Sequence, residues 1–314
     1  MTADAASPLR RVAYLGPEGT FTEQALLGQA DLASQELVGM GTFAEVLAAV
    51  DAGGVDLGFV GIENSIEGTV TVTIDALALE HDLLILREVV MGIQLSLMAP
   101  PGVTMGDVRR VLTFPVAAGQ CRGWLAKELP GVEVVAANSN AEAARMVGDE
   151  HDGQSAAVAP ALAAKIYGLD VLASDIEDHP ENSTRFVLVG KGPVPSPTGH
   201  DKTTIVVFQR ADRAGSLLAI LQEFAARGIN LVKLESRPTK KALGDYCFII
   251  DLEGHLADEL VADCLRDVRS KVADIKFLGS YPAAGEKGVA VRRDAEEAWR
   301  AADAWITAQR AKLT

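Results

Sequence analysis

From residue 11 onward, short apolar runs alternate with amphipathic stretches, and this alternation constrains the fold more than any other feature of the sequence. Two of the amphipathic stretches open with a Thr-Phe-x-Glu pattern, at Thr20 and at Thr42, which is typical of a capped helix start. Strands separated by helices of about 10–15 residues favour βαβ units in mainly parallel sheets. The sequence therefore predicts an α/β fold. Its expected strands are 11–16, 35–40, 56–62, two within 83–100, 109–114, 133–137, 155–160 and 185–189, and its expected helices are 20–29, 42–52, 70–80, 117–128, 139–149 and one ending at Tyr167.

The alternation restarts near residue 100, which predicts two lobes within residues 10–190. Lobe one is expected to take in about 10–90 and 176–190, and lobe two about 91–175. If the final strand returns to the first lobe, the chain crosses twice between the lobes and forms a hinge with a cleft. Ligands of such folds lie beyond the carboxyl ends of the strands, so the cleft is the expected binding site.

A second module follows residues 191–201, which hold three prolines and two glycines and form the clearest linker in the chain. Residues 202–282 show the order βαββαβ, which is the ferredoxin-like arrangement. The tail, 283–314, becomes helical in pattern and carries Trp299 and Trp305 six residues apart. We expect this helix to dock on another surface or subunit.

The composition narrows the class of function. A formal net charge of −14 gives little general attraction for nucleic acid or an anionic membrane, so neither partner is expected. The N-terminus has no apolar run of signal-peptide length and no stretch approaches membrane-spanning length, so we expect a cytoplasmic protein.

Metal and cofactor motifs are missing from the sequence. The three cysteines, Cys121, Cys247 and Cys264, form no C-x-x-C pair, and the chain holds no P-loop, G-x-G-x-x-G or H-E-x-x-H. All five histidines lie in loop-like or exposed contexts. We therefore expect no metal and no cofactor, and chemistry that depends on Thr, Arg, Glu, Asn and Gln.

Two polar motifs precede expected helices. In the first, the amides and hydroxyl near Gly19 and Thr20 suit an anion. In the second, Pro115 starts a helix, and Thr113 and Gln120 are placed to face the cleft from lobe two. The alternative interpretation of both motifs is an ordinary capped helix.

Two further polar motifs mark strand ends. One strand ends in Glu63, which would orient a substrate hydroxyl or, with a raised pKa, donate a proton; Asn64 and Ser65 follow it. Another begins with Thr184, which would hydrogen-bond a leaving group, and Arg185, which would bind a carboxylate bidentately. We expect Phe186 to pack beneath the arginine. The alternative is a solvated turn and a solvated strand end.

These four motifs occur in one chain, in this order, before a ferredoxin-like module that carries Glu-Ser-Arg-Pro. Over residues 11–282 the sequence resembles prephenate dehydratases that have a C-terminal ACT regulatory domain. The resemblance implies two periplasmic-binding-protein-like lobes, an active site in their cleft, conversion of prephenate to phenylpyruvate, carbon dioxide and water, and no cofactor. It implies Thr184, Arg185, Glu63 and Asn64 as catalytic residues. The implied substrate-binding residues are Gly19, Thr20, Ser65, Thr113, Gln120 and Phe186.

The sequence departs from the family pattern in the second motif. Phe114 stands where the family commonly has histidine and Val116 where it has glutamine, although Thr113 keeps a hydroxyl. Two alternatives to prephenate dehydratase are kept: a non-catalytic amino-acid sensor, which would be a solute-binding fold fused to an ACT domain, and arogenate dehydratase, because the sequence does not settle which of the two substrates is used.

The resemblance also implies regulation by L-phenylalanine at the ACT module. Family modules pair side by side, which implies a homodimer or homotetramer with an intersubunit ligand site. The common Pro-Gly-Ala-Leu of the first ACT helix reads Ala-Gly-Ser-Leu here, with Gly215 kept, and Glu-Ser-Arg-Pro is intact. The implied phenylalanine site comprises Gly215, Ser216, Leu217, Leu218, Asn230, Leu231, Glu235, Ser236, Arg237 and Pro238.

Overall fold

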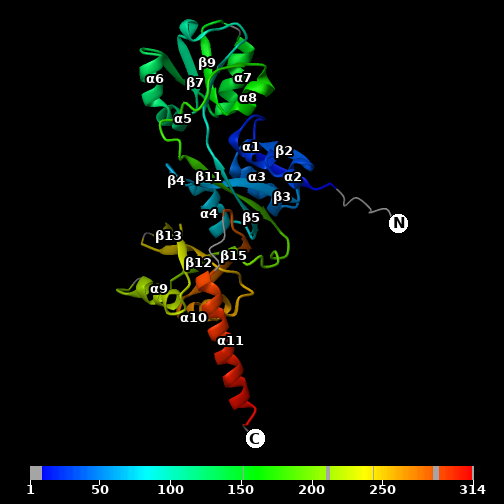
Figure 1. Cartoon of the computed structure of the whole chain (residues 1–314), viewed down its shortest axis with the longest axis vertical. Coiled ribbons are helices and arrows are strands. Elements are labelled where there is room, and N and C mark those ends of the chain that lie inside the picture. Colours follow the sequence, from blue (N-terminus) through cyan, green and yellow to red (C-terminus); the bar gives the residue numbers. More distant parts are fainter. Residues whose placement is uncertain (1–8, 151, 210–212, 243, 286–289, 313–314) are drawn as a thin grey trace, which may run out of the picture. The chain divides into compact units, whose positions relative to one another are not determined.

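The computed structural model describes residues 9–150, 152–209, 213–242, 244–285 and 290–312 (Figure 1). The chain forms two compact units, one made of residues 1–73 and 89–187 and the other of residues 74–88 and 188–314. The second unit thus includes a segment, 74–88, that we had expected within lobe one.

The sheet of lobe one has the strand order β2-β1-β3-β11-β5, with β4 paired to β3. Its strand β1 is parallel to β2 and β3. The last strand of the region, β11, lies between β3 and β5, so the expected return of the chain to this sheet is confirmed. The strands are β1 (Arg11–Leu15), β2 (Glu36–Met40), β3 (Leu57–Asn64), β4 (Gly68–Thr69), β5 (Leu84–Gly92) and β11 (Ser183–Gly190).

Two helices of lobe one, α1 and α3, begin where the capping patterns predicted, whereas the short helix α2 was not predicted and has no side-chain cap. The Thr20 hydroxyl accepts a hydrogen bond from the Glu23 amide at 3.2 Å, and Thr42 accepts one from the Glu45 amide at 3.1 Å. The helices are α1 (Phe21–Leu27), α2 (Ala30–Ala33), α3 (Phe43–Asp51) and α4 (Thr71–Leu79).

The sheet of lobe two has the order β10-β6-β9-β7-β8, with β6 antiparallel to its neighbours and β7 parallel to β8 and β9. Helices α5 and α6 cover one face of this sheet and α7 and α8 the other (Figure 1). The strands are β6 (Ser96–Ala99), β7 (Arg110–Thr113), β8 (Glu133–Ala136), β9 (Ser155–Ala159) and β10 (Asp170–Ala173). The helices are η1 (Met105–Asp107), α5 (Pro115–Gln120), α6 (Arg122–Glu128), α7 (Asn140–Glu150) and α8 (Ala161–Tyr167).

Two details of lobe two differ from the prediction. The helix expected over 117–128 is two helices, because Cys121 leaves the helical conformation at φ −123° and ψ 20°. Strand β10 was not predicted: it is a four-residue edge strand, paired on one side only, and its apolar run is too short to stand out.

The ferredoxin-like module is confirmed as a four-stranded antiparallel sheet with the order β13-β14-β12-β15. Apolar residues of its strands pack against helices α9 and α10 on one face. The elements are β12 (Asp201–Phe208), α9 (Ser216–Ala226), β13 (Leu231–Pro238), β14 (Tyr246–Glu253), α10 (Glu259–Lys271) and β15 (Asp274–Pro282).

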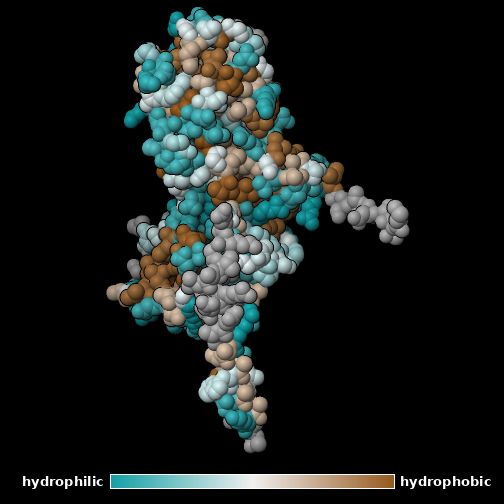
Figure 2. All heavy atoms as spheres, in the orientation of Figure 1, coloured by the Kyte–Doolittle hydropathy of each residue, from teal (hydrophilic) through white to brown (hydrophobic). Residues whose placement is uncertain are grey.

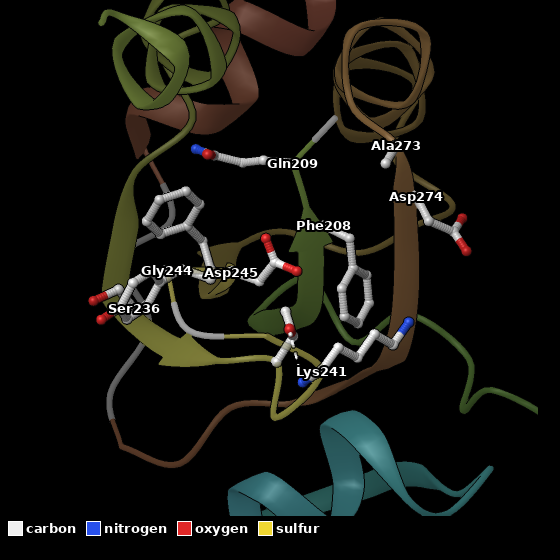
Figure 3. A pocket seen from close by; sticks show the side chains of 11 residues that line it. Phe208, Gln209, Ser236, Lys241, Gly244, Asp245, Ala273 and Asp274 are labelled. Atoms are coloured by element: carbon white, nitrogen blue, oxygen red, sulfur yellow. Dashed lines mark hydrogen bonds between the residues drawn. The ribbon is translucent and has the colours of Figure 1, made fainter. Parts of the chain in front are cut away.

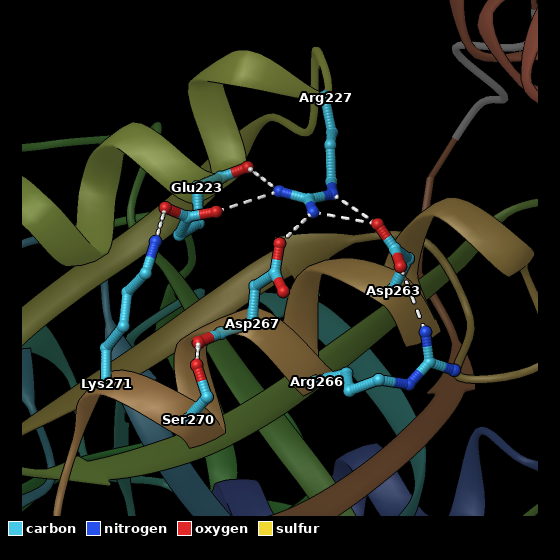
Figure 4. A network of polar contacts seen from close by, with 7 residues as sticks. All are labelled: Glu223, Arg227, Asp263, Arg266, Asp267, Ser270 and Lys271. Atoms are coloured by element: carbon cyan, nitrogen blue, oxygen red, sulfur yellow. Dashed lines mark hydrogen bonds and ion pairs between the residues drawn. The ribbon is translucent and has the colours of Figure 1, made fainter.

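An ion network joins α9 to α10 around Arg227 (Figure 4). Its guanidinium donates to Glu223 at 3.0 Å, to Asp263 at 2.8 Å and to Asp267. Its side chain is only 15 % exposed, so these contacts are partly shielded from water.

Residues 74–88 attach to the module through charges. Asp75 receives two hydrogen bonds from Arg237, at 2.9 and 3.0 Å, and Lys240 lies 3.1 Å from it. The Lys202 ammonium donates to both oxygens of Glu88 at 2.9 Å. The expected assignment of this segment to lobe one alone therefore misses its contacts with the C-terminal module.

The last helix, α11 (Ala290–Arg310), matches the helical pattern predicted for the tail, and its Trp305 is 60 % exposed. All three cysteines are buried and free, as expected. His255 lies in a loop, as expected, but it is buried there, and its Nε2 lies 2.9 Å from the Pro195 carbonyl oxygen. None of the described helices is long and apolar enough to cross a membrane.

Candidate active site

Glu63 and Asn64 lie at the end of β3, and Thr184 and Arg185 lie at the start of β11, the neighbouring strand. The turn after β3 is tied to this strand start by two hydrogen bonds: Ser183 donates its amide to the Ser65 hydroxyl, and Ser65 donates its amide to the Ser183 carbonyl, both at 2.9 Å. Two motifs more than a hundred residues apart in the sequence therefore form one cluster.

Asn64 occupies the centre of this cluster. Its Nδ2 donates to the Thr184 Oγ1 at 2.9 Å and to the Asn182 Oδ1 at 2.9 Å. Its Oδ1 accepts from the amides of Ile66 and Glu67, at 2.9 and 3.0 Å. The side chain is thus held on both ends.

Arg185 and Glu63 form an ion pair of 3.3 Å, with side chains that are 11 % and 35 % exposed. Phe186 is 2 % exposed and stacks on Phe59 with ring centroids 5.4 Å apart. Since successive side chains of a strand point to opposite faces, Phe186 anchors the strand from the face opposite to Arg185. This corrects two expectations, that Phe186 packs beneath the arginine and that it contacts substrate.

Gln120, at the end of α5 in lobe two, joins the same cluster. Its Oε1 accepts from the Asn182 Nδ2 at 3.1 Å, and the residue is 8 % exposed. Sequence reasoning missed Asn182, which is 1 % exposed and links Gln120 to Asn64. Its position two residues before Thr184 was the available signal.

Thr113 differs from the expectation of a cleft-facing hydroxyl. It is fully buried, and its Oγ1 donates to the Val158 carbonyl at 3.2 Å. The two residues that depart from the family pattern, Phe114 and Val116, are 38 % and 37 % exposed. The exposed surface of this motif is therefore apolar.

The turn at Gly19 and Thr20 is also committed to internal bonds. The Gly19 amide donates to the Glu23 carboxylate, and the Thr20 hydroxyl donates to the Leu15 carbonyl at 2.8 Å. Burial, together with the nearby Glu23 carboxylate, raises the pKa of Tyr14, which donates to Glu23 at 3.2 Å. The expectation that this amide and hydroxyl face an anion is therefore not met.

A hollow of about 560 Å³ separates the strand ends of the two lobes beside this turn. Lobe one contributes the ends of β1 and β2, and lobe two contributes the start of α7. Its charged lining residues are Glu18, Glu142 and Arg145. This hollow lies at the carboxyl ends of β1 and β2, as expected for a cleft, but Glu63, Asn64, Thr184 and Arg185 are not among its lining residues. Within the described residues, no cluster of His, Cys, Asp and Glu is arranged to hold a metal ion.

The ten residues implied for phenylalanine binding do not share one surface. Gly215 has a φ of 85°, which explains why glycine is kept before α9. Ser236 lines a hollow of about 640 Å³ with Phe208, Tyr246 and others (Figure 3). Arg237, the next residue of the strand, points to the opposite face and binds Asp75, so it is not placed for the same ligand.

Comparisons with known proteins agree with this organisation. Residues 12–194 match the model of the family Prephenate dehydratase, and residues 203–270 match the ACT domain. The curated prephenate dehydratase of Mycolicibacterium gilvum is 46% identical over 308 residues, which are 94% of this chain and 96% of the relative.

Several solved structures are similar over most of the chain, and two of them are more than 30% identical to it. The prephenate dehydratase of Arthrobacter aurescens in complex with L-Phe has a TM-score of 0.87 and 41% identity, covering 95% of this chain and 98% of that chain. The structure of GqqA, described as a novel type of quorum quenching acylase, has a TM-score of 0.80 and 32% identity, covering 88% of this chain and 98% of that chain.

Proposed function

This chain belongs to the prephenate dehydratase family, and on that premise we propose that it converts prephenate to phenylpyruvate, carbon dioxide and water in the cytoplasm, with Thr184, Arg185, Glu63 and Asn64 in catalytic roles. The observation that carries these roles is the hydrogen bond of 2.9 Å between Asn64 and Thr184, beside the pair of Arg185 and Glu63. The proposal uses no cofactor.

The substrate supplies the driving force, because loss of its carboxylate and ring hydroxyl together makes an aromatic ring. The enzyme must hold the dianion, neutralise the leaving hydroxyl and leave the departing carboxylate unstabilised. Arg185 anchors the carboxylate that stays. Thr184 hydrogen-bonds the leaving hydroxyl, with Glu63 or a bound water as the ultimate proton source.

The site residues of the turn at Gly19 and Thr20 have a smaller part in this proposal than the sequence implied, because their polar groups bind Leu15 and Glu23.

Closure of the two lobes excludes water and aligns the two breaking bonds. Only contacts that are stronger in the transition state raise the rate. Thr184 should therefore affect mainly kcat, and Arg185 should affect both kcat and KM.

The test is a phenylpyruvate assay on the wild type, Thr184→Ala and Arg185→Ala. Loss of one aimed donor costs about 10²–10³-fold, so we expect Thr184→Ala to lower kcat by that factor with a small change in KM. Thr104→Ala, which removes an exposed hydroxyl bound to Asp107, is the matched control and should keep wild-type kinetics. A Thr184→Ala enzyme in which only KM rises would contradict the role.

The choice between prephenate and arogenate is tested in the same assay by the ratio of kcat/KM for the two substrates. A folded wild type that turns over neither substrate would favour the amino-acid sensor, and Phe114 and Val116 would then be the first residues to revert. Because GqqA shares the scaffold, the fold alone does not fix the chemistry, and the assay of the site residues carries the conclusion.

We further propose that L-phenylalanine regulates the enzyme at the ACT domain, as the L-Phe complex of the Arthrobacter relative supports. The proposed site forms between two ACT domains, from the start of α9 at Gly215 and Ser216 and the start of β13 at Asn230 and Leu231. The effector can favour one cleft state only if its affinity for the two states differs. A flat velocity curve across added L-phenylalanine, with no calorimetric heat, would remove this proposal.

A further inference from the structure

The chain of amides from Asn64 through Asn182 to Gln120 has a defined direction. We infer that Asn182 is a positioning residue that fixes the orientation of the Gln120 amide, so that Gln120 presents its NH₂ group to the site as a donor. This inference rests on the dehydratase function proposed above, since it assigns Gln120 a polarity within that site.

The direction is set first at Asn64. Its Oδ1 faces the backbone amides of Ile66 and Glu67, at 2.9 and 3.0 Å, and backbone amides can only donate. The opposite end of the Asn64 side chain must therefore be its NH₂ group. This group donates to Thr184 and to Asn182, both at 2.9 Å.

The direction is passed on at Asn182. Because its Oδ1 accepts from Asn64, its own NH₂ group faces Gln120, at 3.1 Å from Oε1. The residue is 1 % exposed, so water does not compete for these bonds. Its backbone is held as well, by the bond from its amide to the His179 carbonyl at 3.0 Å and by the Ile93 amide, which donates to its carbonyl at 2.8 Å.

The consequence reaches lobe two. With Oε1 of Gln120 bound to Asn182, the remaining group of that amide is NH₂. Gln120 then offers hydrogen-bond donors in the same cluster as the Thr184 hydroxyl, whose oxygen already accepts from Asn64. Two donors from different lobes suit a substrate that carries two carboxylates and expels a hydroxyl.

Asn182→Asp tests whether Asn182 sets the orientation of the Gln120 amide. An ionised carboxylate at this position still accepts from Asn64 but cannot donate to Gln120, whose amide must then rotate and turn its oxygen to the site. Turning one hydrogen-bond donor away from its acceptor costs about 10–100-fold in rate, so we expect kcat per folded enzyme to fall by that factor while KM changes by less than about threefold.

The pH profile distinguishes this role from a merely structural one. When the introduced carboxyl is protonated, it can again donate to Gln120, so the ratio of variant to wild-type kcat should rise as the pH is lowered. Asn182→Leu, which can never donate, should show no such rise. Other ionisable groups near Asn182 are present in both enzymes, so their effect on the pH profile cancels in the ratio of the two kcat values. These groups are Glu63, Arg185, Asp178, His179 and Glu181.

Four further variants complete the test. Asn140→Asp is the matched control, because the Asn140 Oδ1 accepts from the Phe114 amide at 3.0 Å and a carboxylate can accept in the same way, so kcat should stay within about twofold. Gln120→Glu keeps the oxygen towards Asn182 but turns a second oxygen to the site, so it should lose kcat at unchanged thermal stability. Adding Asn182→Asp to Gln120→Ala should cost nothing further if the two act as one unit.

The outcomes separate the inference from the function it rests on. The proposed role of Asn182 would be overturned by wild-type kcat in Asn182→Asp or in Gln120→Glu, or by fully additive losses of kcat when Asn182→Asp is combined with Gln120→Ala. A large loss of kcat in Thr184→Ala would still support the dehydratase site in that case. Full activity of Thr184→Ala would instead overturn the proposed function. If Asn182→Asp does not fold, Gln120→Glu alone decides whether the site needs a donor there.

Discussion

A single hydroxyl group shows how much of this site depends on the direction of hydrogen bonds. The Thr184 oxygen accepts from Asn64, so the one proton of the hydroxyl remains for another acceptor. Residue type alone does not give this direction. It follows from the two backbone amides that hold the far end of Asn64.

Asn64→Asp is therefore expected to impair catalysis more than stability. The carboxylate keeps the bonds from Ile66 and Glu67, but Thr184 must now donate to it and has no proton left for the leaving hydroxyl. We expect kcat to fall about 10²–10³-fold, measured in the phenylpyruvate assay, with a thermal midpoint close to that of the wild type. A variant whose kcat stays within about threefold would show that Thr184 does not act as a donor.

At this scale the sequence predicted which residues gather but not how each is used. Glu63, Asn64, Thr184 and Arg185 meet because the end of β3 lies beside the start of β11, its neighbour in the sheet, and a purely parallel arrangement would not have brought them together. The hydroxyl of Thr113 was predicted to face the cleft, but it donates to the carbonyl of Val158 on β9. The local sequence around Thr113 does not show that β9 lies beside it.

Elements of the fold were predicted where local chemistry decides them. Helices α1 and α3 begin directly after their capping residues Thr20 and Thr42, because the capping bonds form within four residues of chain. Strand β10 was missed because it exists only through pairing with β6, a partner about seventy residues away. Arg237 was misplaced for a related reason, since Asp75 lies far from it in the sequence.

At the scale of elements, the contact between α9 and α10 depends on Arg227 more than on any exposed pair beside it. Arg227→Ala leaves the carboxylates of Glu223, Asp263 and Asp267 close together without their shared cation. We expect the free energy of unfolding of the ACT domain to fall by about 1–3 kcal/mol, measured by calorimetry of the whole chain.

Arg266→Ala is the control for this prediction. Arg266 pairs with Asp263 at 2.9 Å but its side chain is 70 % exposed, so removing it should cost less than about 1 kcal/mol. Equal losses in the two variants would mean that the network around Arg227 contributes no more than an ordinary surface pair.

At the scale of the whole molecule, Asp75 makes the stability of the C-terminal unit depend on pH. Burial raises the pKa of this carboxyl, but the hydrogen bonds from Arg237 and Lys240 outweigh burial and hold the pKa below its ordinary value of 3.8. A carboxyl with a lowered pKa stabilises the fold above its unfolded pKa, and this contribution is lost as the pH falls through the folded pKa.

Asp75→Asn should therefore be less stable than the wild type at neutral pH, and the difference should shrink as the pH falls below about 4. Chemical denaturation of both proteins from neutral to acidic pH measures this. Glu80→Gln is a suitable control, because Glu80 lies 3.5 Å from Lys240 but is 55 % exposed. A difference between wild type and Asp75→Asn that does not change with pH would show that the charge of Asp75 is not what stabilises the unit.

The assembly of the molecule is expected to depend on the edge strand β13. Leu218, Val232 and Leu234 are 59 %, 42 % and 43 % exposed, and Figure 2 shows hydrophobic surface over β13 and α9. An edge strand that exposes apolar side chains is a template for pairing with another chain, which supports the side-by-side pairing of ACT domains. Leu234→Lys places a charge on that edge, so we expect a smaller assembly by light scattering and a weaker calorimetric signal with L-phenylalanine.

Val134→Lys is the control, because it puts the same charge on β8, an exposed edge of lobe two, and should change neither the assembly size nor the calorimetric signal. If Leu234→Lys keeps the wild-type mass and still binds L-phenylalanine, the pairing edge is not β13, and the effector site must be sought within one ACT domain, in the hollow beside Ser236.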